Sequence, residues 1–69
     1  MDQYEFTIKG HISDYWSSVF DGFDIHRLSG GMTKISGDVI DQSHLFRMLT
    51  SIRDTGLALI EVKKIPKEL

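Results

Sequence analysis

The sequence predicts one α+β domain of the ferredoxin-like βαββαβ type. Three observations indicate this fold. Residues 4–12 alternate between apolar and polar side chains, as a half-buried strand does, and residues 41–56 carry one apolar stripe at helical spacing. The pattern Ile-x-Gly-x-(Ile/Val)-x-Asp also occurs twice, at 8–14 and again at 35–41. Each copy runs from a strand into a helix start, so the chain uses a strand-helix-strand unit twice.

The first unit opens with a strand over residues 4–12, whose even-numbered residues face the core. Gly10 belongs to this face and, having no side chain, lets a helix pack close to the strand. Ser13 or Asp14 then offers an N-cap for a helix of about two turns. Gly22 fits the αL position that ends this helix.

A hairpin follows the first helix. Phe23 and Ile25 begin its first strand, and residues 29–31, Ser-Gly-Gly, form the turn. A three-residue loop closed by a glycine in αL gives the register in which Ile25 and Ile35 both face the core.

The second helix is predicted to start after Asp41, the best N-cap in the chain, and to stop at Gly56. Phe46, on the flank of its stripe, is expected to pack between the two helices. The stripe itself contains Leu45, Met48, Leu49 and Ile52. The last strand runs from Leu57 to Ile65. Its predicted core face has Ala58, Ile60 and Val62, and its other face has Leu57, Leu59, Glu61 and Lys63.

Topology rules turn these elements into an architecture. Right-handed crossovers place both helices on one face of the sheet. The expected sheet is antiparallel with strand order 4-1-3-2, and the repeat matches an approximate two-fold axis between strands one and three. The whole chain, 1–69, is predicted to be a single domain.

Composition excludes several function classes. The chain has 69 residues, no cysteine and a formal net charge of -2. Disulfides, thiolate catalysis and cysteine-based metal sites are therefore absent, and the charge is a poor match for phosphate-rich nucleic acid. No apolar run approaches the roughly 20 residues that cross a bilayer, and the N-terminus does not resemble a signal peptide. We expect a cytoplasmic protein with no cofactor, no nucleic-acid partner and no membrane contact.

The open face of the predicted sheet offers a candidate partner surface. Most of its residues are polar, but Leu28, Met32, Leu57 and Leu59 are not. We therefore expect this face, or an edge strand beside it, to form a homo-oligomer or to bind a protein partner. The need of a small domain for extra stabilisation also favours self-association. In the alternative interpretation, residues 65–66 cover the two leucines near the last strand.

Three residues on the same face are candidate ligand-binding residues: His11, His26 and Lys34. The two histidines lie on strands separated by one other strand, about 10 Å apart at their bases. This spacing and the charge of Lys34 disfavour a shared metal ion, so no metal site is expected. Two interpretations remain: the three residues bind an anion together, or they are solvated side chains on the surface. No phosphate loop, nucleophile elbow or H-E-x-x-H motif occurs, so no catalytic residue is assigned and no enzyme activity is expected.

Known families with this strand order differ in their motifs. The open face lacks the aromatic residues of RNA-recognition domains, and neither the cysteine pair of heavy-metal carriers nor the Arg and Asn of acylphosphatases is present. Residues 10–14 loosely resemble the ligand loop of ACT-type regulatory domains. An ACT-like domain that binds a small molecule or an anion is thus the alternative to an interaction module.

A further resemblance spans nearly the whole chain. It rests on Lys9-Gly10-His11, Trp16, Phe20-Asp21-Gly22, Gly37-x-Val39-x-Asp41-Gln42-x-x-Leu45 and Ile52-Arg53-Asp54-x-Gly56-Leu57-x-Leu59-Ile60-x-Val62. With these residues the chain resembles a family of short, stand-alone bacterial and archaeal proteins that has no assigned activity. The chain differs from this family mainly in the hairpin, residues 27–34. It implies an independent domain and no catalytic residue.

Overall fold

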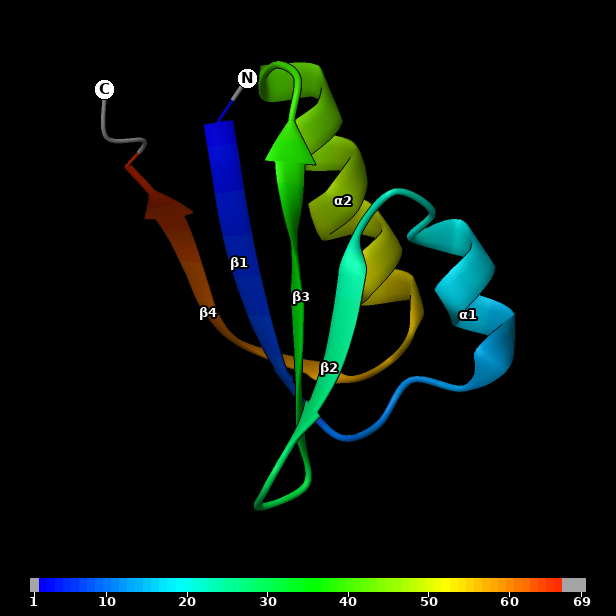
Figure 1. Ribbon diagram of the computed structural model, residues 1–69. Helices are drawn as coiled ribbons and strands as arrows, with labels where there is room; N and C mark the ends of the chain where they lie inside the picture. The colour runs from blue at the N-terminus through cyan, green and yellow to red at the C-terminus, as the bar shows by residue number, and fades with distance from the viewer. Residues whose placement is uncertain (1, 67–69) are drawn as a thin grey trace.

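The computed structural model describes residues 2–66, and in them the predicted βαββαβ order is confirmed (Figure 1). The elements are β1 (Asp2–Lys9), α1 (Asp14–Val19), β2 (Asp24–Leu28), β3 (Met32–Val39), α2 (Gln42–Asp54) and β4 (Ala58–Ile65). The strands form one antiparallel sheet in the order β2-β3-β1-β4, which is the predicted order read in reverse. Both helices lie on the same side of the sheet (Figure 1).

The core forms between the sheet and α2. Ile8 and Ile35, the first residues of the two repeat copies, are both fully buried, and Ile25 pairs with Ile35 across the hairpin as predicted. The other buried apolar residues are Phe6, Ile12, Phe20, Val39, Met48 and Ile52. Burying such a side chain stabilises the fold by about 1.5–3 kcal/mol, so this cluster supplies most of the driving force.

The two helices differ in how firmly their N-termini are held. Asp41 caps α2 as predicted, because its carboxylate accepts a hydrogen bond from the backbone N–H of His44 at 2.8 Å. The His44 ring returns the contact, with Nδ1 accepting from the N–H of Ile40 at 3.0 Å. By contrast, α1 is six residues long, its N-cap Ser13 makes no side-chain hydrogen bond, and none of its residues is buried.

The glycines of the two repeat copies have different roles. Gly10 lies beyond β1 with φ +117°, which L-residues rarely adopt, and the side chain of Leu57 fills the space beside it. The expectation that a helix packs close to Gly10 is therefore wrong. Gly37 lies within β3, and a Cβ there would be 2.6 Å from Cδ2 of Phe23. Each glycine is thus approached closely by one side chain, Leu57 at Gly10 and Phe23 at Gly37, and neither of these residues lies in a helix.

A β-bulge changes the predicted faces of β4. The register against β1 shifts between Thr7 and Ile8, so that Val62 pairs with Phe6 and Leu59 pairs with Ile8. Residues that face each other in an antiparallel pair lie on the same side, so Leu59 lies on the helix face and not on the open face as predicted. Leu57 precedes β4 and packs against the core. The predicted open-face position of both leucines is wrong.

Phe46 does not pack between the helices. Its side chain is 56% exposed. The hollow between α1 and α2 is lined by Val19, Asp21, Phe23, His44, Arg47, Met48 and Ser51. Phe46 is about 200° around the helix from buried Met48, because each residue turns an α-helix by about 100°. This angle carries the phenyl ring toward solvent.

Candidate functional site: the uncovered edge strand

The most exposed apolar segment of the sheet is β4, which lies at one end of the strand order. Leu59, Ile60 and Val62 are 42%, 54% and 40% exposed, although each is a residue that cores normally bury. The buried residues of the sheet lie instead in β1, the neighbour of β4, and in β3. The exposed segment 59–62 is called the β4 apolar edge below.

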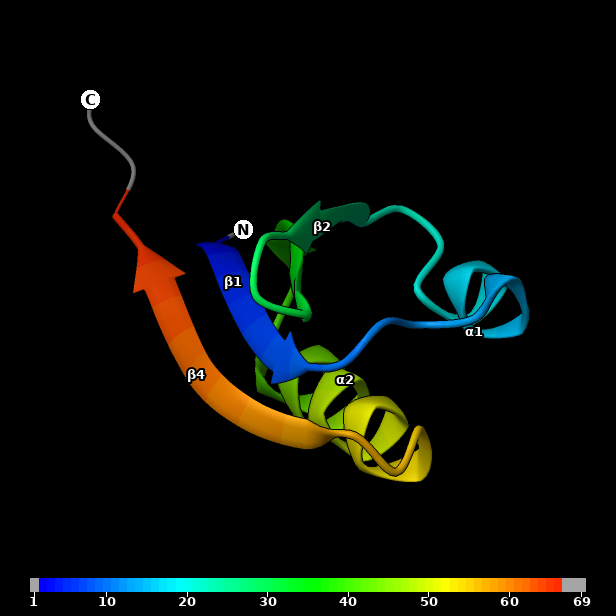
Figure 2. The same cartoon turned by 90° about the horizontal axis from the view of Figure 1, so that it is seen from below.

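The placement of the helices explains this exposure. Two helices usually cover the face of a four-stranded sheet, but here α1 is short and lies at the opposite side of the molecule from β4 (Figure 2). Only α2 remains to cover the centre of the sheet, and its buried residues are Met48 and Ile52. The helix face of β4 is therefore left open.

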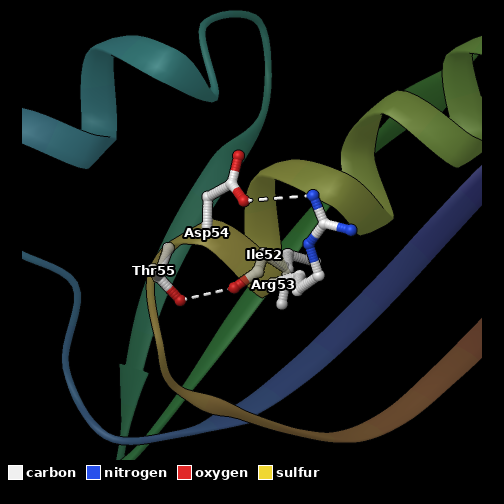
Figure 3. A network of polar contacts seen from close by, with 4 residues as sticks. All are labelled: Ile52, Arg53, Asp54 and Thr55. Atoms are coloured by element: carbon white, nitrogen blue, oxygen red, sulfur yellow. Dashed lines mark hydrogen bonds and ion pairs between the residues drawn. The ribbon is translucent and has the colours of Figure 1, made fainter.

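The end of α2 fixes the direction in which the chain enters β4. The hydroxyl of Thr55 donates to the carbonyl of Ile52 at 2.6 Å (Figure 3). The same hydroxyl accepts from the N–H of Leu57 at 3.1 Å. The neighbouring pair of Arg53 and Asp54 has an N–O distance of 3.4 Å and is exposed, so it contributes little to stability. The Thr55 hydroxyl thus ties the last turn of α2 to the connection that leads into β4.

Charged residues alternate with the apolar ones in β4. Glu61 pairs with Thr7 and Lys63 pairs with Glu5, so both charges lie on the open face of the sheet. Lys64 points to the other face and forms an exposed ion pair with Asp2 at 3.4 Å. The strand therefore presents an apolar residue and charges of both signs at neighbouring positions.

The open face brings together some of the sequence-predicted residues. His26 pairs with Lys34, and Leu28 pairs with Met32 in the same two strands. A shallow hollow on this face is lined by Glu5, His26, Arg27, Leu28, Lys34 and Ser36. The ammonium of Lys34 is 3.7 Å from the carboxylate of Glu5, which offsets part of its charge.

His11 is not among the residues that line this hollow. It lies in the connection between β1 and α1, because β1 ends at Lys9 and the positive φ of Gly10 breaks the alternation. Two of the three predicted ligand-binding residues are thus adjacent, and the third is elsewhere. Among residues 2–66, no three side chains of the metal-binding types are arranged to hold an ion.

Sequence reasoning missed the exposure of Ile60 and Val62, which it placed on the core face of the last strand. The sequence did contain a signal, because residues 57–60 are apolar without interruption and so violate the period of two. Such a run in an edge strand means that apolar side chains occupy both faces or that a bulge resets the register.

Comparison with known proteins gives one match. Residues 3–63 match the family described as Domain of unknown function (DUF8691). The chain belongs to this family. The matched range reaches Lys63, so the β4 apolar edge is part of the family domain. No curated protein and no solved structure matches the chain.

The family description agrees with the resemblance to a family that has no assigned activity. Within the described residues, no helix is both long and apolar enough to span a membrane.

Proposed function

We propose that the domain is a small interaction module that associates with a second copy of itself through β4. The observation that supports this function is the exposure of the β4 apolar edge, where Leu59, Ile60 and Val62 have no covering element. Apolar residues that are exposed together on a small domain favour an interaction site.

The backbone of β4 supports the same function. An edge strand presents unpaired N–H and C=O groups, and a second strand can satisfy them by extending the sheet. β4 is eight residues long, which gives room for a ladder of several hydrogen bonds. Backbone pairing and burial of apolar side chains would therefore act together in the same interface.

The experiment compares two valine variants by sedimentation or by light scattering after size exclusion, over a wide range of protein concentration. Val62→Asp places a charge in the β4 apolar edge, whereas Val19→Asp changes a valine of closely similar exposure in α1, at the opposite side of the molecule. We expect a dimer for the wild type and for Val19→Asp, and a monomer for Val62→Asp. A wild type that stays monomeric at high micromolar concentration would rule out self-association.

The hollow on the open face supports a second candidate function, the binding of an anion or a small anionic molecule. The observation that favours it is the adjacency of His26 and Lys34, with Arg27 and Ser36 beside them. Ligand binding to the native state raises Tm, so phosphate, sulfate, amino acids and nucleotides can be screened by thermal shift. We expect Lys34→Gln to abolish a shift that His11→Ala leaves intact. A screen with no shift removes this candidate.

A further inference from the structure

We infer that two copies of β4 pair in antiparallel register about a two-fold axis that passes midway between the two copies of Val62, which then lie opposite each other. This inference rests on the proposed function and adds to it the geometry of the interface. Most homodimers have a two-fold axis, and the same surface of each copy then faces the other. For two identical antiparallel strands, the register is fixed by the residue that lies opposite its own copy; this residue is said below to be on the axis.

The charges of β4 favour this register over those centred on Glu61, Lys63 or Lys64. Glu61 and Lys63 both lie on this face, on either side of Val62. With Val62 on the axis, Glu61 of each copy lies opposite Lys63 of the other, which gives two pairs of unlike charge. With Glu61 on the axis two carboxylates would oppose each other, and with Lys63 or Lys64 on it two ammonium groups would. Unlike charges stabilise a cross-strand pair and like charges destabilise it.

The helix face favours the same axis. Val62 lies on this face because it pairs with Phe6, and its side chain is 40% exposed. An axis through Val62 brings the two valine side chains together at the centre of the interface. Charge therefore sets the register, and the apolar contact supplies the affinity, which is the usual division between the two effects in an interface.

The regular part of β4 makes this pairing possible. The bulge lies on the side of Leu59 and Ile60, and from Glu61 to Ile65 each residue pairs with one residue of β1 without a shift. Lysines and bulges on an edge strand can also prevent pairing. If β4 pairs with a second copy, reversing one charge weakens the dimer. If the lysines protect the edge, replacing Lys63 by glutamate increases association.

Cysteine cross-linking tests the axis directly, because the chain has no cysteine of its own. Directly opposed residues in an antiparallel pair have Cα atoms about 4.5–5.5 Å apart, within the range of a disulfide. Val62→Cys should therefore form a cross-linked dimer rapidly under mild oxidation. Lys64→Cys, on the same face, is the control. Its two copies would be offset by four residues along the strands, about 13 Å, which is too far to bridge.

Charge reversal tests whether the opposed charges contribute to the interface. Glu61→Lys gives chains in which only positive charges oppose each other, and Lys63→Glu gives chains in which only negative charges do. Each variant alone should be less dimeric than the wild type. An equimolar mixture should form a heterodimer, because every opposed pair in it joins unlike charges. Circular dichroism and Tm of each variant show that the domain is folded.

The outcomes separate this inference from the proposed function. Cross-linking at residue 62 and not at residue 64, with recovery of the dimer on mixing, supports the axis through Val62. If the wild type dimerises but Val62→Cys links no faster than Lys64→Cys, or if mixing restores nothing, the register is wrong and self-association stands. If lysines protect the edge, the wild type is monomeric and Lys63→Glu increases association, which overturns both proposals.

Discussion

The contact between Gly37 and Phe23 provides the sharpest test of the packing. A Cβ on Gly37 would lie 2.6 Å from Cδ2, 2.9 Å from Cγ and 3.0 Å from Cε2 of the Phe23 ring. The ring cannot simply turn aside, since it packs against the core and lies edge-on to the His44 ring with centroids 5.8 Å apart. Gly37→Ala therefore forces a partly buried aromatic residue to move.

The magnitude follows from two opposing effects. Overpacking a core by one carbon costs about 1–3 kcal/mol. Replacing glycine by alanine at an ordinary φ recovers about 0.4–1 kcal/mol by reducing the entropy of the unfolded chain. We expect Gly37→Ala to lower the free energy of unfolding by about 1–2 kcal/mol. In a domain of this size that corresponds to a decrease in Tm of about 4–16 °C.

Chemical denaturation and thermal melts followed by circular dichroism measure this loss. Protein concentration is kept constant, because self-association makes Tm depend on it. Phe23→Ala provides the control, since truncating the ring removes the obstacle. In that background Gly37→Ala should be neutral or slightly stabilising, and the double-mutant cycle gives the coupling between the two residues. Equal losses in both backgrounds would refute the clash as the cause.

Three further predictions concern single contacts, each measured by the same melts. Thr33→Val should lower Tm by several degrees, because the buried hydroxyl donates to the Gly10 carbonyl at 2.6 Å and loss of this hydrogen bond costs about 1 kcal/mol. Thr33→Ser keeps the hydroxyl, so it should retain the stability that this hydrogen bond contributes. Asp41→Ala should cost about 0.5–2 kcal/mol through loss of the cap on the His44 N–H, and Asp41→Asn should restore most of it. Phe46→Ser should change stability by less than about 0.5 kcal/mol, because the ring is exposed; a larger loss would show that Phe46 is packed.

The order of the elements was predictable from the sequence because it depends on local chemistry. The cap at Asp41, the Ser-Gly-Gly turn and the alternation in β1 each specify one element, and the crossover rules then leave few sheets to choose from. The pairing of Ile25 with Ile35 followed from the loop length alone. These features are set within a few residues of the chain, so the pattern identifies them.

The faces of residues near the ends of β1 and β4 were not predictable in the same way. Counting by two assumes that a strand continues without interruption, and this assumption fails at Gly10 and at the bulge in β4. One extra residue in the bulge moved Leu59 to the helix face, and the positive φ of Gly10 placed His11 in a connection outside the strand. Both candidate sites changed as a result. The open face kept only His26 and Lys34 of the three predicted ligand-binding residues.

The position of Phe46 could not be predicted from the sequence for another reason. A helical wheel shows which residues share a flank, but only the placement of the neighbouring elements shows what covers that flank. Because α1 lies against the other flank of α2, Phe46 meets solvent. The exposure of β4 likewise depends on where the helices lie over the sheet, so local patterns could show neither feature.

The difference between the two edges of the sheet explains why pairing through β4 would stop at a dimer. The opposite edge, β2, is five residues long, and its exposed residues Asp24, His26 and Arg27 place charge or polarity on both faces. Edge strands that are short and charged resist pairing. If both edges could pair, β4 of one copy would join β2 of the next, and such a head-to-tail contact does not close on itself and builds filaments. Among the described residues, β4 is the longer of the two edges and carries the exposed apolar residues Leu59, Ile60 and Val62, so a second β4 would be the better partner for it. A contact between two copies of β4 would use this edge on both chains, so neither chain would have it free to bind a third copy.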